Sequence, residues 1–159
     1  MAADSDLALA HPADDACDIQ VLVRSDSREQ PDDFPLAGCR YGFSLSWETR
    51  LRSVDIDLQC VVVDSAGTIV DCAYYNNLKA VGAVTHSGDR AHRKPDDVAQ
   101  ALWVNAQRVP SHVDLLVLVV AAYAGGSLQD IDHCQMHVFE ESEARQVALF
   151  EMERCIGGA

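Results

Sequence analysis

The chain has few cationic side chains and no long hydrophobic run. Its 159 residues include 12 Lys and Arg against 25 Asp and Glu, which gives a formal net charge of -13. Nucleic-acid binding depends on cations that neutralise phosphates, so cations or basic partners suit this chain and nucleic acid does not. No apolar run approaches the roughly 20 residues that cross a bilayer, and the N-terminus lacks a basic region followed by a hydrophobic segment. We therefore expect a cytoplasmic protein without membrane association.

The sequence also lacks the motifs of several enzyme classes. Gly125 and Gly126 are not followed by the Lys-Ser/Thr pair that a P-loop requires, and they are not part of a GxGxxG pattern. No nucleotide chemistry is therefore expected. His86, Ser87 and Asp89 include the residue types of a hydrolytic triad. However, no nucleophile elbow is present, and triad members rarely crowd into four residues. We expect no catalytic activity.

Six cysteines occur without a CxxC pair, and nothing indicates secretion, so reduced thiols are expected. His133, Cys134 and His137 suggest a zinc site. On a strand, however, the two histidines lie about 13 Å apart and the cysteine points to the opposite face. Only a helix or a sharp bend would bring them together; otherwise they are surface histidines on a strand.

Short alternating segments predict an all-β fold. The composition, 48% hydrophobic and 23% charged, fits one globular domain, which we expect over residues 19–159 after a disordered or loosely ordered tail over 1–18. Residues 41–47 and 133–139 alternate as half-buried strands do, and the apolar run 115–123 has the length of a central buried strand. Many strands with little helix favour a β-sandwich of two mainly antiparallel sheets.

Residues 54–64 form an acidic strand that is the most informative segment. Ile56 and Leu58 share one face, and Asp55 and Asp57 share the other, about 7 Å apart at the backbone. Two such carboxylates repel each other unless solvent, a cationic side chain or a hard metal ion offsets the charge, and calcium prefers oxygen ligands. Because DxD pairs are common, a solvated acidic face is the alternative to a cation site.

Seven short motifs follow one another in an order and spacing that resemble the TerD (tellurium-resistance) domain family over about residues 41–139. The motifs are the strand Gly42–Trp47, the Asp-x-Asp strand Asp55–Leu58, Asp64-x-x-Gly67, Tyr74-Tyr75-Asn76-Asn77, His86-Ser87-Gly88-Asp89, Asp96-Asp97, and Val109-Pro110 with the valine-rich run that follows. Each motif is weak by itself, and the order makes the set specific.

This resemblance implies a β-sandwich that binds calcium through acidic loops and acts as a stress-response or signalling scaffold, without established catalysis. The candidate calcium ligands carried over by position are Asp55, Asp57, Asn76, Asn77, Asp89, Asp96 and Asp97. Loops at one end of a sandwich can bring several carboxylate and amide oxygens together around one ion of about six to eight ligands.

The loop over residues 90–95 departs from the family pattern. It is shorter than the family's glycine-rich loop, it contains Arg90, Arg93 and Lys94, and the family's glutamate is absent after Asp97. Basic side chains can replace a metal ion as the counter-charge of acids. The alternative function is therefore a metal-free protein-interaction module that uses an open sheet edge and its acidic surface.

The family continues into further strands beyond a segment like 147–152, whereas this sequence stops at Ala159. Residues 143–155 contain good helix formers and also alternate as a strand does, so both states stay open. Either the sandwich is completed in another way or an edge is left unpaired. An unpaired edge is a template for a protein partner or for self-association.

Overall fold

The computed structural model describes residues 19–22, 33–49, 54–88, 100–141 and 145–151. Within these ranges the chain forms strands joined by turns and two single-turn 3-10 helices. In chain order these elements are β1 (Ile19–Leu22), β2 (Asp33–Leu36), β3 (Arg40–Thr49), β4 (Asp55–Asp64), β5 (Ile69–Ala73), β6 (Lys79–Ala80), β7 (Val84–His86), β8 (Ala101–Asn105), η1 (Ala106–Arg108), β9 (Val113–Ala124), η2 (Leu128–Asp130), β10 (Ile131–Glu140) and β11 (Arg145–Glu151).

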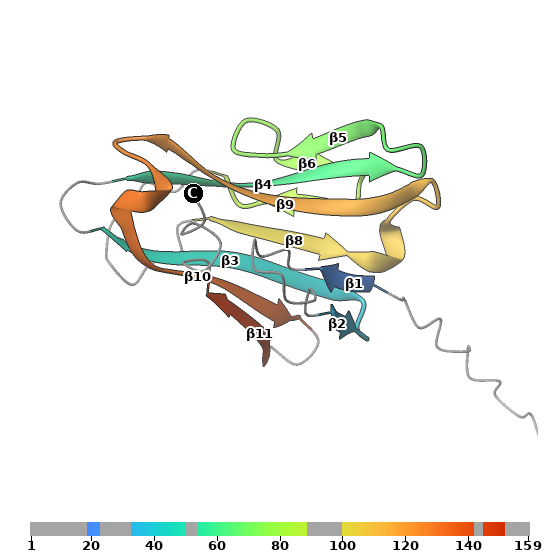
Figure 1. Ribbon diagram of the computed structural model, residues 1–159. Coiled ribbons are helices and arrows are strands. Elements are labelled where there is room, and N and C mark those ends of the chain that lie inside the picture. The colour runs from blue at the N-terminus through green and yellow to red at the C-terminus, as the bar shows by residue number, and fades with distance from the viewer. Residues whose placement is uncertain (1–18, 23–32, 50–53, 89–99, 142–144, 152–159) are drawn as a thin grey trace, which may run out of the picture.

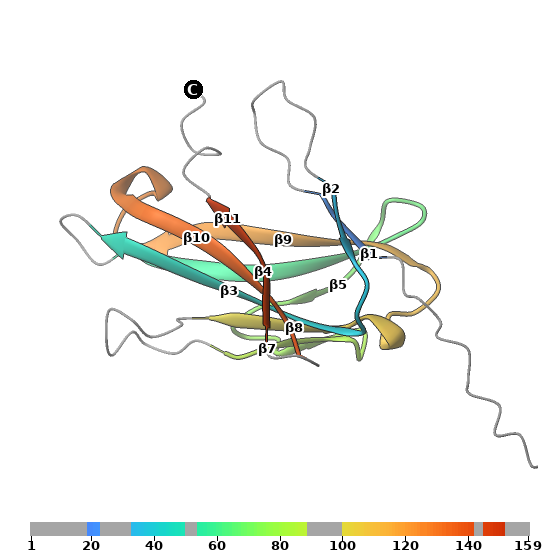
Figure 2. The same ribbon diagram turned by 90° about the horizontal axis from the view of Figure 1, so that it is seen from below.

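The strands form two stacked sheets, as the alternation predicts. The larger sheet has the order β11-β10-β3-β8-β7-β6, the smaller sheet has the order β5-β4-β9, and β1 pairs with β2 in a separate ribbon. Figure 1 shows the smaller sheet lying over β8, β3 and β10 as a second layer, and Figure 2 shows the same layers from below. The predicted all-β sandwich of mainly antiparallel sheets with little helix is confirmed.

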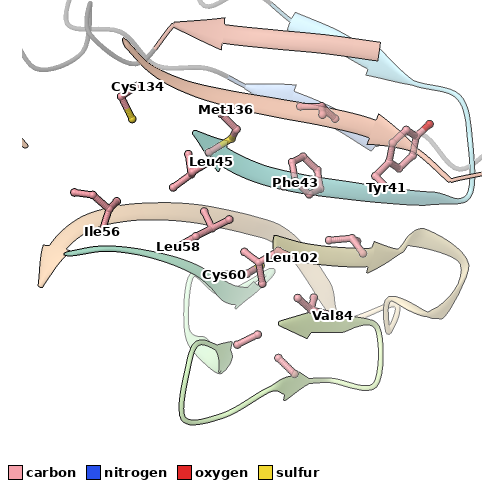
Figure 3. Close-up of a cluster of buried hydrophobic side chains, with 14 of the residues drawn as sticks. Tyr41, Phe43, Leu45, Ile56, Leu58, Cys60, Val84, Leu102, Cys134 and Met136 are labelled. Carbon is pink, nitrogen blue, oxygen red and sulfur yellow. The ribbon is translucent and has the colours of Figure 1, made fainter. Parts of the chain in front are cut away.

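The core fills the space between the two sheets. On β4, the even-numbered residues from Ile56 to Val62 are almost fully buried, which confirms that they share the inner face. Figure 3 shows Leu58 and Cys60 of β4 facing Leu45 and Leu102 of the opposite sheet. Burying such apolar side chains stabilises the fold by about 1.5–3 kcal/mol each, so this alternation specifies the position of β4.

β10 and β3 carry the same alternation into the larger sheet. Cys134, Met136 and Val138 are buried on β10, and Tyr41 and Phe43 are buried on β3, which agrees with the alternation predicted for residues 133–139 and 41–47. In the described part of the chain, Cys39, Cys60, Cys72 and Cys134 form no disulfide.

One sequence-based prediction requires correction, and one strand was missed. The apolar run 115–123 was expected to be a central strand, but it lies in β9, which is at an edge of the smaller sheet. A continuous apolar run predicts burial on both faces, whereas Leu115, Val117 and Tyr123 are exposed. β2 was not predicted, because Pro35 and the acidic residues around it are typical of a loop; it pairs with β1 all the same.

The structure decides the ambiguous C-terminal segment in favour of a strand. β11 pairs with β10 from Gln135↔Glu151 to Glu140↔Arg145 and forms one edge of the larger sheet.

The predicted tail, residues 1–18, lies outside the described residues. Among the residues that are described, no helix is both long and apolar enough to span a bilayer.

Candidate functional site

Two side chains, one from β7 and one from the residue before β8, complete the edge of β4 where β5 ends. β5 pairs with β4 as far as Ala73 opposite Cys60. Two residues further along β4, the backbone N–H of Leu58 donates to Oε1 of Gln100 over 2.6 Å. The carbonyl oxygen of Leu58 accepts from Nε2 of His86 over 2.9 Å. We call Asp57, Leu58, His86 and Gln100 the inter-sheet junction.

The hydrogen bonds of His86 define its protonated nitrogen. The backbone N–H of Gly88 donates to Nδ1 over 2.9 Å, so Nδ1 is an acceptor and Nε2 carries the hydrogen that Leu58 receives. Gly88 has a φ of 83°, a conformation that glycine adopts without strain. Since His86 is 2% exposed and both of its ring nitrogens are used, its role within the described residues is structural.

Ser87 has a similar structural role in holding β7 against β8. Its Oγ accepts the backbone N–H of Ala101 over 2.9 Å and donates to the Gly88 carbonyl oxygen over 3.2 Å. Because His86 bonds to Leu58 and Gly88, the described residues contain no hydrogen bond from Ser87 to its imidazole. This geometry gives no support to a triad that includes these two residues.

Asp57 is a nearly buried carboxylate with a neutral partner. It is 7% exposed, and its Oδ1 accepts Nε2–H of Gln100 over 3.0 Å. Among the described residues, no cationic side chain forms an ion pair with it. The solvated-face interpretation is therefore wrong at Asp57, because burial has removed most of its water. Asp55, on the same face, is half-buried.

The loop that carries Asn76 and Asn77 lies beside the junction. The backbone N–H groups of Tyr74 and Asn77 each donate to the carbonyl oxygen of the other, and Nδ2 of Asn77 donates to the Cys72 carbonyl over 2.7 Å. The next residue, Leu78, accepts the His86 N–H over 2.8 Å. Asn76 and Asn77 are exposed, so their side-chain oxygens can be reached from solvent.

Three predicted ligands, Asp89, Asp96 and Asp97, lie outside the described residues. The described residues on either side of the segment 89–99 are Gly88, which donates to His86, and Gln100, which belongs to the junction. In the described part of the chain, no group of three His, Cys, Asp or Glu side chains is close enough to hold a metal ion. The described residues therefore supply part of a ligand set at most.

Sequence reasoning missed Gln100 as a site residue. Its partners Asp57 and Leu58 lie 43 and 42 residues away, and no local pattern marks a glutamine that bonds across sheets. Its 3% exposure is unusual for glutamine, but burial becomes visible only in the folded chain.

A second polar group lies on the outer face of the larger sheet. Nε2 of His137 bonds Oγ of Ser46 over 2.8 Å, and Nδ1 bonds Oε1 of Gln146 over 3.2 Å. Cys134 is buried on the opposite face of β10. The zinc interpretation of His133, Cys134 and His137 therefore finds no support, because His137 uses both nitrogens and the thiol points into the core.

Comparison with known proteins connects this fold to one family. A family model described as the TerD domain matches residues 39–157. The tellurium resistance protein TerZ of Serratia marcescens is 30% identical over 101 residues, which cover 63% of this chain and 52% of that protein. The tellurium resistance protein TerD of Alcaligenes sp is 30% identical over 86 residues, covering 50% and 45%. This chain thus aligns with only about half the length of these curated relatives.

Solved structures show the same fold. The crystal structure of a homologue of telluride resistance protein (TerD) from Streptomyces coelicolor A3(2) superposes with a TM-score of 0.60 at 15% identity, covering 73% of each chain. A crystal structure of a protein of unknown function superposes with a TM-score of 0.60 at 11% identity, covering 76% of this chain and 75% of the other. At these identities the likeness concerns the fold alone.

Proposed function

Because the chain belongs to the TerD domain family, we propose that it is a non-enzymatic module that binds calcium at the inter-sheet junction. The observation that supports this proposal is the environment of Asp57. Asp57 is 7% exposed, and among the described residues its carboxylate receives one hydrogen bond, from the neutral amide of Gln100. A nearby cation stabilises a carboxylate that has so little contact with solvent, because removing its charge from water costs free energy.

The chemistry of Asp57 fits a calcium ligand. Calcium takes about six to eight oxygen ligands at about 2.3–2.6 Å, from carboxylates, amides, carbonyls and water. Gln100 orients one carboxylate oxygen, and the exposed oxygens of Asn76 and Asn77 lie on a loop that neighbours His86. Asp89, Asp96 and Asp97 would complete the set from the segment attached at Gly88 and Gln100. Bound calcium would supply a positive charge for these carboxylates.

The alternative is a metal-free module, in which Arg90, Arg93 and Lys94 provide that charge. A guanidinium that pairs with a carboxylate satisfies it without a metal ion. The two functions predict different effects on stability and calcium affinity when these three basic residues are replaced by uncharged ones. If they are the counter-charge, their removal destabilises the protein; if calcium is the counter-charge, their removal leaves calcium affinity equal or higher.

The test is isothermal calorimetry of calcium added to chelator-stripped protein. We expect saturable binding to the wild-type protein and a loss of affinity of at least about tenfold in Asp57→Asn, since ligand charge sets calcium affinity. Asp114→Asn is the matched control, because it removes the same charge from an exposed position of β9. Equal binding by all three proteins would exclude Asp57 as a ligand.

A parallel measurement separates the two functions. The variant Arg90→Gln/Arg93→Gln/Lys94→Gln is compared with the wild-type protein by thermal unfolding in chelator and in about 5 mM calcium, where a ligand of the native state raises the melting temperature. Stabilisation of both proteins by calcium supports the calcium module. Absence of any calcium effect, together with a lower melting temperature of the variant, supports the metal-free module.

The names of the relatives suggest the biological context. Two curated relatives are named tellurium resistance proteins, so we propose a role in stress response, in which ion status is transmitted to a protein partner. Deletion of the gene should lower growth in tellurite, and complementation by Asp57→Asn should fail where the wild-type gene succeeds. Full complementation by Asp57→Asn would separate the stress role from the proposed ion site.

A further inference from the structure

Among the described residues, β9 is an edge strand whose central part lacks the usual protection of such edges. In the described residues it pairs with β4 on one side and with no strand on the other, and Figure 2 shows it at the margin of its sheet. Exposed edges are commonly blunted by Lys, Pro or bulges, because their unpaired backbone groups attract other strands. From Leu115 to Ala124 the strand contains no charged residue and no proline. Its pairing with β4 is free of bulges from Leu115 to Ala122.

The junction shows which backbone groups point to this free edge. Leu58 directs its N–H and carbonyl to Gln100 and His86, on the side away from β9. Leu58↔Val120 is therefore a non-hydrogen-bonded pair of the antiparallel ladder, and Val120 directs its own N–H and carbonyl away from β4. By the same alternation, the residues with edge-directed backbone groups are Leu116, Leu118, Val120 and Ala122.

The outer face of the smaller sheet is apolar next to this edge. Leu115 is 52% exposed and Val117 is 37% exposed, and both lie on the face opposite the core. Val119 follows them on the same face and is half-buried. A strand added beside β9 would cover part of this apolar surface and would also form hydrogen bonds with the backbone groups of β9 that point away from β4.

We infer that the free edge of β9 pairs with β9 of a second copy of this chain, antiparallel about a two-fold axis near Val119. An antiparallel strand pair is self-complementary, so one edge can serve both copies. The net charge of -13 makes two copies repel each other over most of their surface, and the uncharged stretch from Leu115 to Ala124 avoids this repulsion. A basic peptide would find no acid in that stretch to attract it. The product is one continuous sheet with the order β5-β4-β9-β9-β4-β5.

Sedimentation equilibrium of the full chain tests the pairing. We expect a concentration-dependent monomer–dimer equilibrium, and we expect Val119→Lys to raise its dissociation constant by at least about tenfold, because it places two like charges across the axis. Ile69→Lys is the matched control: it adds the same charge to the same sheet face, on β5 at the opposite edge, where the side chain is 66% exposed. We expect this control to dimerise as the wild-type protein does.

A second variant targets the backbone groups themselves. Val120→Pro removes an N–H that points to the free edge, a position at which strands tolerate proline. Circular dichroism verifies the fold of each variant, and a folded Val120→Pro protein should be monomeric.

The inference is overturned if the wild-type protein stays monomeric up to about 0.5 mM, where even weak contacts populate dimers. It is also overturned if the folded Val119→Lys variant dimerises as the wild-type protein does. A third contrary result is an equally weakened dimer in Ile69→Lys, which would indicate that two copies pack through the outer faces of their smaller sheets and not through the edge of β9.

Discussion

His86 donates from Nε2 to the carbonyl oxygen of Leu58 over 2.9 Å, so a side chain of the larger sheet occupies the place of a missing strand in the smaller one. The two residues are 28 positions apart in the chain. The bond holds the two sheets together and also gives the Leu58 carbonyl oxygen a hydrogen-bond partner, which the apolar core would not supply.

Replacement of this histidine should destabilise the fold. His86→Phe keeps an aromatic ring but leaves the Leu58 carbonyl and the Gly88 N–H without their partner, so we expect a loss of about 1–3 kcal/mol in the free energy of unfolding. Urea denaturation followed by fluorescence measures the loss. His112→Phe, at an exposed position, is the control. Equal denaturation midpoints for the two variants would contradict a structural role of His86.

Gln100 should be replaceable only together with Asp57. Gln100→Glu places a second carboxylate about 3 Å from Asp57 and removes the donor, and we expect it to cost about 2–4 kcal/mol of stability at pH 7. Adding Asp57→Asn restores a donor–acceptor pair with the roles exchanged and should recover at least about 1 kcal/mol. The double-mutant cycle is measured in chelator. Additive losses would show that the two side chains do not interact.

Gly42 should tolerate a methyl group only if Trp103 is made smaller. A Cβ at position 42 would lie 2.6 Å from the Trp103 ring, so Gly42→Ala should cost about 1–3 kcal/mol through the displacement of the indole. Trp103→Leu should remove most of this penalty, which the two single variants and the double variant measure by thermal unfolding. A Gly42→Ala penalty that is unchanged in the Trp103→Leu background would exclude the steric explanation.

Cys60 should make the fold sensitive to alkaline pH. Burial, with a smaller contribution from the neighbouring Cys72, raises the pKa of the Cys60 thiol from 9.0 to about 12. The folded state therefore keeps a proton that the unfolded state releases, so this stabilisation is complete below pH 9 and is lost as pH rises from about 9 to 12. The expected slope is at most about 1.4 kcal/mol per pH unit.

The Cys60→Ala variant isolates this effect. It should be less stable than the wild-type protein at pH 7, because it leaves a cavity in the core, but its stability should fall less steeply above pH 9. Urea denaturation at pH 7, 9 and 10.5 gives the difference between the two proteins, in which the titration of other groups cancels. Parallel pH profiles for the two proteins would rule out Cys60 as the titrating group.

Local alternation predicted the faces of the strands but not their neighbours. Ile56 and Leu58 were assigned to one face of β4, and the core contains both because a period of two is a property of the backbone itself. The run in β9 was equally visible, yet its place at an edge depends on which strands pair. Periodicity contains no information about that choice.

The all-β class, the two faces of β4 and the resemblance to the TerD family follow from the amino-acid sequence, because each rests on a short-range pattern or on the order of motifs. The tertiary structure decided that Asp57 is buried against Gln100 and that His86 bonds to Leu58. It also decided that, among the described strands, β9 pairs with β4 alone. These contacts join residues that are dozens of positions apart. Their energies arise only when two sheets meet and exclude water, which no local segment of the chain can specify.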